Sequence, residues 1–113
     1  MFRASSPGDH PVLWNGVLVS YAQHAEDVHL RRALGAEPDG FWIDVGAHDP
    51  VRDSVTLHFS ASGWRGVNVE PLPELHARLA AARPRDVNVR AAVSDAPGPL
   101  ELVVTGARRA CRR

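Results

Sequence analysis

Residues 41–50 read FWIDVGAHDP, an apolar, aromatic and β-branched run that stops at a glycine. A short run of this kind, bounded by turn residues, predicts a buried β-strand over residues 41–45. The glycine that follows, Gly46, lets the backbone turn sharply and lets a ligand approach the main chain. In an open α/β sheet, ligands bind at the carboxyl ends of the strands, so this turn is a candidate binding loop.

Outward from this strand, helices and strands alternate along the chain. Hydrophobic spacing and turn residues predict a helix over 20–34, a short helix over 53–62, a strand over 64–69, a helix over 71–82, and strands over 87–93 and 100–104. Alternation of strands with helices indicates an α/β fold with a parallel sheet.

The expected helix ends carry capping residues. Ser20 with Gln23 fits a capping box at the start of the first helix, and Gly35 is expected to end that helix. Asp53 is expected to cap the short helix, and Gly63 is expected to end it.

A single domain accounts for the 113 residues. We expect a loose lead-in over residues 1–19, the domain over 20–105 and an arginine-rich tail over 106–113. A short block of like charges at a terminus is typical of a solvated segment, and we interpret the tail in that way.

Composition excludes several function classes. The formal net charge is zero because 13 arginines balance 13 acids, which argues against a nucleic-acid binder. Cys111 is the one cysteine, so there is no intrachain disulfide and no cysteine cluster for a metal, and no metal is expected. Neither a signal peptide nor a membrane span is evident, so we expect a cytoplasmic protein with no membrane partner.

Two expected strand ends carry groups suited to a nucleoside. The first ends in Asp44-Val45-Gly46, and the second ends in Glu70, whose carboxylate could accept two hydrogen bonds from ribose hydroxyls. Together they describe a nucleoside-binding cleft. Each also has a plainer interpretation, because Gly46 could be a mere turn and Glu70 a solvated acid.

The loop after the first strand discriminates among nucleoside cofactors. A dinucleotide fingerprint requires glycines where His48 and Val51 stand, and Asp49 puts a negative charge where a pyrophosphate would lie. A dinucleotide oxidoreductase fragment is therefore disfavoured, and the lack of lysine excludes a P-loop. An acidic loop containing Asp44 and Asp49 suits S-adenosylmethionine, which carries a positive sulfonium and a positive amino group and has no phosphate.

Five runs of the sequence, in order and at similar spacing, resemble the FkbM methyltransferase family. They are residues 20–27, 40–50, 53–56, 63–71 and 88–95. The resemblance covers most of the chain, from about Ser20 to Val104. It implies a Rossmann-like class I methyltransferase fold, with a parallel sheet flanked by helices. It also implies methyl transfer from S-adenosyl-L-methionine to a small-molecule acceptor, typically an oxygen of a sugar or polyketide-like natural product.

The resemblance also implies roles for individual residues. Asp44, Gly46 and Ala47 would line the methionine part of the cofactor, and Glu70 would hold the ribose hydroxyls. Ser94 and Asp95 fall near the end of the third strand, where the adenine ring would lie.

Three further residues have alternative interpretations. Gln23 and Asp27 belong to the leading helix and would either close the pocket or serve as capping and surface residues. The sequence does not identify a catalytic residue, and His48 in the cofactor loop is a candidate for a base.

The family pattern continues beyond the point where this sequence turns arginine-rich. We therefore expect a fold truncated after about four strands, with an exposed sheet edge through which copies could self-associate. The alternative to an active enzyme is a non-catalytic domain that binds S-adenosylmethionine or a nucleotide, or serves in an interaction.

Overall fold

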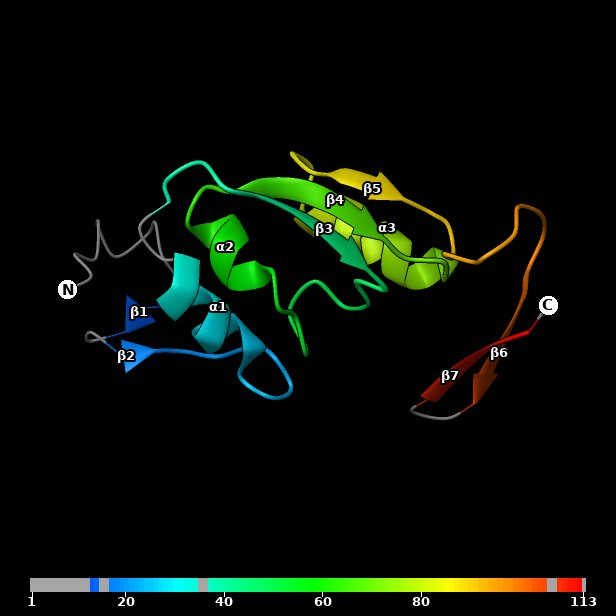
Figure 1. The fold of residues 1–113 in the computed structure, drawn as a ribbon, viewed down its shortest axis with the longest axis horizontal. Helices are drawn as coiled ribbons and strands as arrows, with labels where there is room; N and C mark the ends of the chain where they lie inside the picture. The colour runs from blue at the N-terminus through cyan, green and yellow to red at the C-terminus, as the bar shows by residue number, and fades with distance from the viewer. Residues whose placement is uncertain (1–12, 15–16, 35–36, 106–107, 113) are drawn as a thin grey trace.

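The computed structural model describes residues 13–14, 17–34, 37–105 and 108–112. Its centre is a parallel sheet of three strands in the order β3-β4-β5 (Figure 1). The strands are β3 (Phe41–Val45), β4 (Arg65–Val69) and β5 (Val87–Val89). Their register places Ile43 beside Val67, and Val67 beside Val87. The expected parallel α/β sheet is thus confirmed for these three strands.

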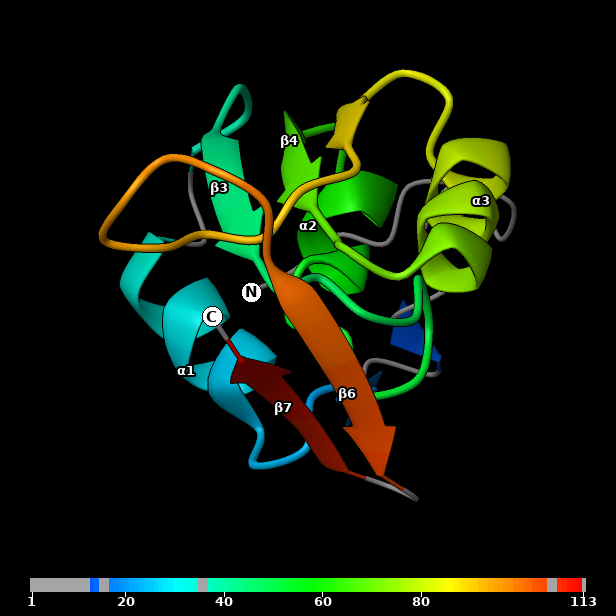
Figure 2. The ribbon, with the colours of Figure 1, turned by 90° about the vertical axis from the view of Figure 1, so that its right-hand side faces the viewer.

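Helices connect the strands of this sheet. α2 (Leu57–Ala61) lies between β3 and β4, and α3 (Pro73–Ala82) lies between β4 and β5. α3 begins with a proline at its first turn, where the missing N–H costs nothing, and ends before Arg83, as the sequence predicts. α1 (Glu26–Leu34) precedes the sheet. Figure 2 shows α1 on the β3 side and α3 on the β5 side.

Two antiparallel hairpins lie at opposite ends of the molecule (Figure 1). They are formed by β1 (Leu13–Trp14) with β2 (Val17–Leu18), and by β6 (Glu101–Thr105) with β7 (Arg108–Arg112). The expected fourth strand therefore exists, but it does not join the parallel sheet. β7 lies in the segment expected to be a solvated tail, and it pairs with β6 because the apolar, β-branched run of β6 offers backbone groups to the chain that follows it.

The first helix starts later than the capping box predicts. α1 begins at Glu26, not at Ser20, and the preceding Ala25 has a positive φ of 58° that no helix contains. Asp27, in the first turn of α1, instead binds the segment before the helix: its carboxylate accepts hydrogen bonds from Ser20 Oγ at 2.6 Å and from the backbone N–H of Tyr21 at 2.8 Å. The capping box of Ser20 with Gln23 is thus wrong, and Gly35 lies outside the described residues.

The predicted boundaries of α2 and β5 also differ from the observed ones. Asp53 does not cap α2, because the hydroxyl of Ser54 accepts the N–H of Leu57 at 3.1 Å. Gly63 does end the helix, with a φ of 98°. β5 stops at Val89, and not at residue 93, because its partner β4 ends at Val69.

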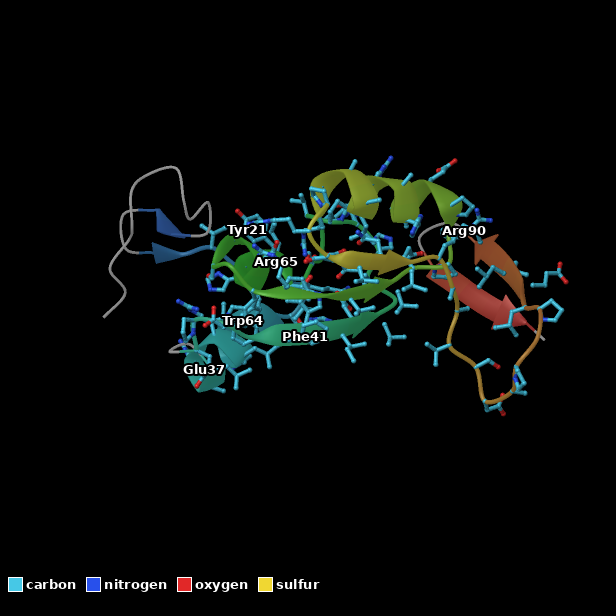
Figure 3. All side chains as sticks on the ribbon, turned by 90° about the horizontal axis from the view of Figure 1, so that it is seen from above. Tyr21, Glu37, Phe41, Trp64, Arg65 and Arg90 are labelled. Atoms are coloured by element: carbon cyan, nitrogen blue, oxygen red, sulfur yellow. The ribbon has the colours of Figure 1, made fainter. Side chains whose placement is uncertain are left out.

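The face of the sheet that α2 and α3 cover is polar as well as aromatic. Asn68 is fully buried there, and its Oδ1 accepts the indole N–H of Trp42 at 2.9 Å. The indole of Trp42 lies flat over Gly66, where any Cβ would overlap the ring. Nearby, Trp64 packs against Phe59 and donates to the carbonyl of Glu37 at 2.8 Å (Figure 3).

The opposite face is apolar and exposed. Phe41, Ile43 and Val45 of β3 are 62%, 69% and 58% exposed, and Val87 and Val89 of β5 are 59% and 39% exposed. Parallel sheets are normally covered on both faces, so this face departs from the usual arrangement. In the described part of the chain, no helix is long and apolar enough to cross a membrane.

Candidate functional site

The loop after β3 is fastened to the end of β4. Gly46 adopts a positive φ of 75°, which only glycine takes up without strain. The turn directs the N–H groups of Gly46 and Ala47 onto the carbonyl of Val69, at 2.8 and 3.1 Å. The two strand ends that the sequence singled out are therefore adjacent.

Glu70 joins the two loops at this end of the sheet. Its Oε2 accepts the N–H of His48 at 2.8 Å, and its Oε1 accepts the N–H of Leu72 at 3.1 Å. The side chain is 0% exposed. Glu70 thus clamps the β3 loop to the start of α3 from beneath. Its expected role as a ribose ligand stays a prediction, since here it holds backbone groups.

A cleft of about 970 Å³ opens beside this clamp, at the carboxyl ends of β3 and β4. That volume lies in the range of cofactor pockets. Its walls are the β3 loop, the first turns of α3, and single residues from the α1 lead-in and β6. The lining residues are Gln23, His48, Asp49, Arg52, Asp53, Leu72, Pro73, Glu74, Leu75, Arg78 and Val104.

Carboxylates outnumber guanidinium groups in this cleft, three to two. Asp49 accepts the N–H groups of Val51 and Arg52, both at 2.9 Å, and pairs with Arg78 at 3.4 Å. The hydrogen bond from Val51 is the largest of the effects that lower the pKa of Asp49, and those from Arg52 and Arg78 add to it. Asp49 therefore presents a fixed negative charge at the rim.

Two residues of the loop hold conformations that side chains rarely adopt. His48 and Asp53 have φ values of 60° and 58°. Each such residue costs of order 1–3 kcal/mol, and they concentrate at binding and catalytic loops. Both line the cleft, so the backbone strain and the cleft coincide.

Asp44 lies beneath the loop on the covered face of the sheet. Burial raises the pKa of its carboxyl above the usual range, while the nearby charge of Arg83 and a hydrogen bond from Thr56 pull that pKa back down. Asp44 does not line the cleft itself. It supports the loop from below.

Sequence reasoning missed Arg83, which ties the end of α3 to the segment after the loop. Its side chain is buried and donates to Thr56 Oγ1 at 3.1 Å, to the carbonyl of Pro50 at 2.9 Å and to Ser54 Oγ at 3.3 Å. It also pairs with Asp86 at 3.8 Å, with both side chains 3% exposed. An arginine before a proline at a helix end is usually solvated, so the sequence held no distinct signal.

The residues expected to bind a cofactor fall into two groups. Asp44, Gly46, Ala47 and Glu70 lie at or beneath the β3 loop beside the cleft, and none of the four lines it. Ser94 and Asp95 do not line it; they lie on the exposed loop after β5, beside a separate hollow of about 370 Å³. The placement of the adenine ring near these two residues stays a prediction.

The two residues of the leading segment have different positions. Gln23 lines the cleft, whereas Asp27 is buried in the first turn of α1, where it holds the preceding segment. Among the histidines that the structure describes, His48 alone lines the cleft. Across the ranges that the structure describes, no three His, Cys, Asp or Glu side chains are grouped so as to hold a metal ion.

Comparison with known proteins gives one match. The family model described as "Methyltransferase FkbM domain" matches residues 44–111, which is more than half of the chain. No curated protein and no solved structure matches the chain significantly. The match begins at Asp44, takes in the β3 loop and the Glu70 clamp, and continues through the β6–β7 hairpin. The chain therefore belongs to the FkbM methyltransferase family.

Proposed function

We propose that this chain binds S-adenosyl-L-methionine in the cleft at the ends of β3 and β4, and serves methyl transfer to a hydroxyl of a sugar or natural product. The observation that carries the proposal is the coincidence of the family match with an acidic cleft built on the β3 glycine loop. The cofactor would supply an electrophilic methyl group on a positive sulfur.

The residues present fit such a cofactor. The cleft has the volume of a cofactor pocket, and its carboxylates Asp49, Asp53 and Glu74 favour a ligand with positive sulfonium and ammonium groups. Arg52 and Arg78 can pair with the ligand's carboxylate. Leu72 and Leu75 offer apolar surface for its uncharged parts.

The chain's residues would act mainly by holding the reactants in line. Alignment of nucleophile, methyl and sulfur can contribute much of the rate of a transfer reaction. Glu70 and Gly46 fix the loop that forms one wall, and His48 is the candidate to accept the acceptor's hydroxyl proton.

Calorimetric titration with S-adenosylmethionine tests the proposal. Asp49→Asn and Asp53→Asn remove charge from the cleft, and each is expected to weaken binding about threefold to tenfold. Glu37→Gln, an exposed acid that does not line the cleft, is the matched control and should leave binding unchanged.

The outcomes separate three cases. Binding by the parent that weakens only in the cleft variants supports the proposal. Binding without conversion of the cofactor to S-adenosylhomocysteine in the presence of any hydroxylated acceptor supports the alternative, a non-catalytic binding domain. A folded parent that does not bind at millimolar cofactor contradicts the proposal.

A further inference from the structure

The exposed face of the parallel sheet carries apolar side chains on all three strands. They are Phe41, Ile43, Val45, Val67, Val69, Val87 and Val89. Figure 3 labels Phe41 on β3, the strand of the sheet that lies farthest from α3. The opposite, polar face is the one that the helices cover, so the strands' most apolar surface is left to solvent.

The exposed apolar area of this face is at the upper end of the range for monomeric proteins. The exposed fractions of Phe41, Ile43, Val45, Val87 and Val89 correspond to about 500 Å² of apolar surface on one copy, where monomers rarely exceed a few hundred. Two such faces brought together would remove about 1,000 Å² from water, which is the size at which specific interfaces begin.

The chemistry of the face suits a second copy of itself. Among the strand positions on this side, Arg65 alone is charged, and its guanidinium donates back to the carbonyls of Gly63 and Trp64 at 3.0 and 2.9 Å. A two-fold pairing therefore brings no like charges together at its centre. Rows of valine and isoleucine on a sheet interdigitate when two sheets stack about 10 Å apart.

We infer that this chain forms a two-fold dimer by stacking the apolar faces of its two parallel sheets. The assembly has four layers, with the helices outside and the two sheets inside. The face differs from the free edge of β3, which offers backbone groups and would give edge-to-edge pairing instead. The cleft is at the carboxyl ends of the strands, so the proposal is independent of cofactor binding.

Sedimentation velocity of the purified chain over a range from about 1 to 100 μM tests this inference, because an interface of this size is expected to give micromolar affinity. Val67→Lys places a charge on the central strand, where it opposes stacking and does not reach an edge partner. Ile43→Lys places a charge at the most exposed position of the face, on the edge strand β3, so it opposes both stacking and edge pairing. Val51→Lys, an exposed valine of the β3 loop, is the matched control.

The expected result is a dimer for the parent and the control, and a monomer for both face variants across the whole range, with far-UV circular dichroism unchanged. A folded parent that stays monomeric at 100 μM overturns the inference. So does a dimer that persists in Val67→Lys, because that variant leaves the edges of the sheet unchanged and the result assigns association to an edge.

Discussion

Replacement of Arg83 by methionine removes the buried cation that joins α3, the β3 loop and the segment before β5. Methionine keeps an unbranched apolar side chain of similar length, so the change removes charge and hydrogen bonds with little loss of volume. The buried carboxylate of Asp86 then loses the cation with which it pairs. Ser54, Thr56 and the carbonyl of Pro50 each lose a hydrogen-bond donor.

The cost follows from the geometry. Removal of one partner of a buried ion pair typically costs 3–5 kcal/mol. Asp86 keeps two other donors, the N–H of Gly66 at 3.3 Å and Asn68 Nδ2 at 3.1 Å, so we expect about 3 kcal/mol, the lower end of that range. Domains unfold with about 5–15 kcal/mol, so the variant would lose a large share of the total.

Urea unfolding, followed by far-UV circular dichroism and tryptophan fluorescence, measures this loss. Arg78→Met is the matched control, because Arg78 pairs with Asp49 at the surface with 63% of its side chain exposed, and it should cost less than about 1 kcal/mol. In Arg83→Met/Asp86→Asn the two costs should not add, since the second change removes the unpaired charge. An Arg83→Met variant no less stable than Arg78→Met would refute this reasoning.

Three further changes have distinct expected outcomes. Gly66→Ala forces a methyl group into the indole of Trp42 and should lower the free energy of unfolding by about 1–3 kcal/mol in a denaturant titration. Gly46→Ala meets no atom within 4 Å, so its cost of about 1–2 kcal/mol comes from the positive φ alone, and Gly46→Asn should cost less. Burial raises the folded-state pKa of Asp44 above its ordinary value of 3.8, so the folded chain holds that proton at pH values where the unfolded chain has released it, and stability falls as pH rises through this window. The stability of Asp44→Asn relative to the parent should therefore increase from pH 4 to pH 7, and an unchanged difference would contradict the assignment.

Local patterns were enough to find the sheet and its loop. The run from Phe41 to Val45 and the proline-led helix before Arg83 each carry their signal within a few residues, and both are confirmed. The start of α1 was not predictable in the same way. Ser20 and Gln23 satisfy the capping pattern, but Asp27 offers two carboxylate oxygens to the same segment and holds it outside the helix, which begins at Glu26.

The sequence contains the alternation that gives the sheet a polar face, but the prediction from sequence did not use it. β4 and β5 alternate in the period of a strand, with Gly66, Asn68 and Asn88 on one side and valines on the other. What the sequence could not show is which face the helices cover. That depends on pairings such as Arg83 with Asp86 and Ser54, which no local pattern contains.

The same network explains why the helices cover the polar side. Asn68, Asp86 and Asn88 bond to one another beneath the sheet, and Arg83 continues the chain of contacts to the β3 loop. Each of these side chains is buried or half-buried and has a hydrogen-bond partner. Removal of one side chain therefore leaves a polar group of its neighbour without that partner. Helix α3 is thereby coupled to the loop that walls the cleft, and a change beneath the sheet should alter cofactor affinity as well as stability. A helix packed on valines alone would stabilise the sheet without placing the loop.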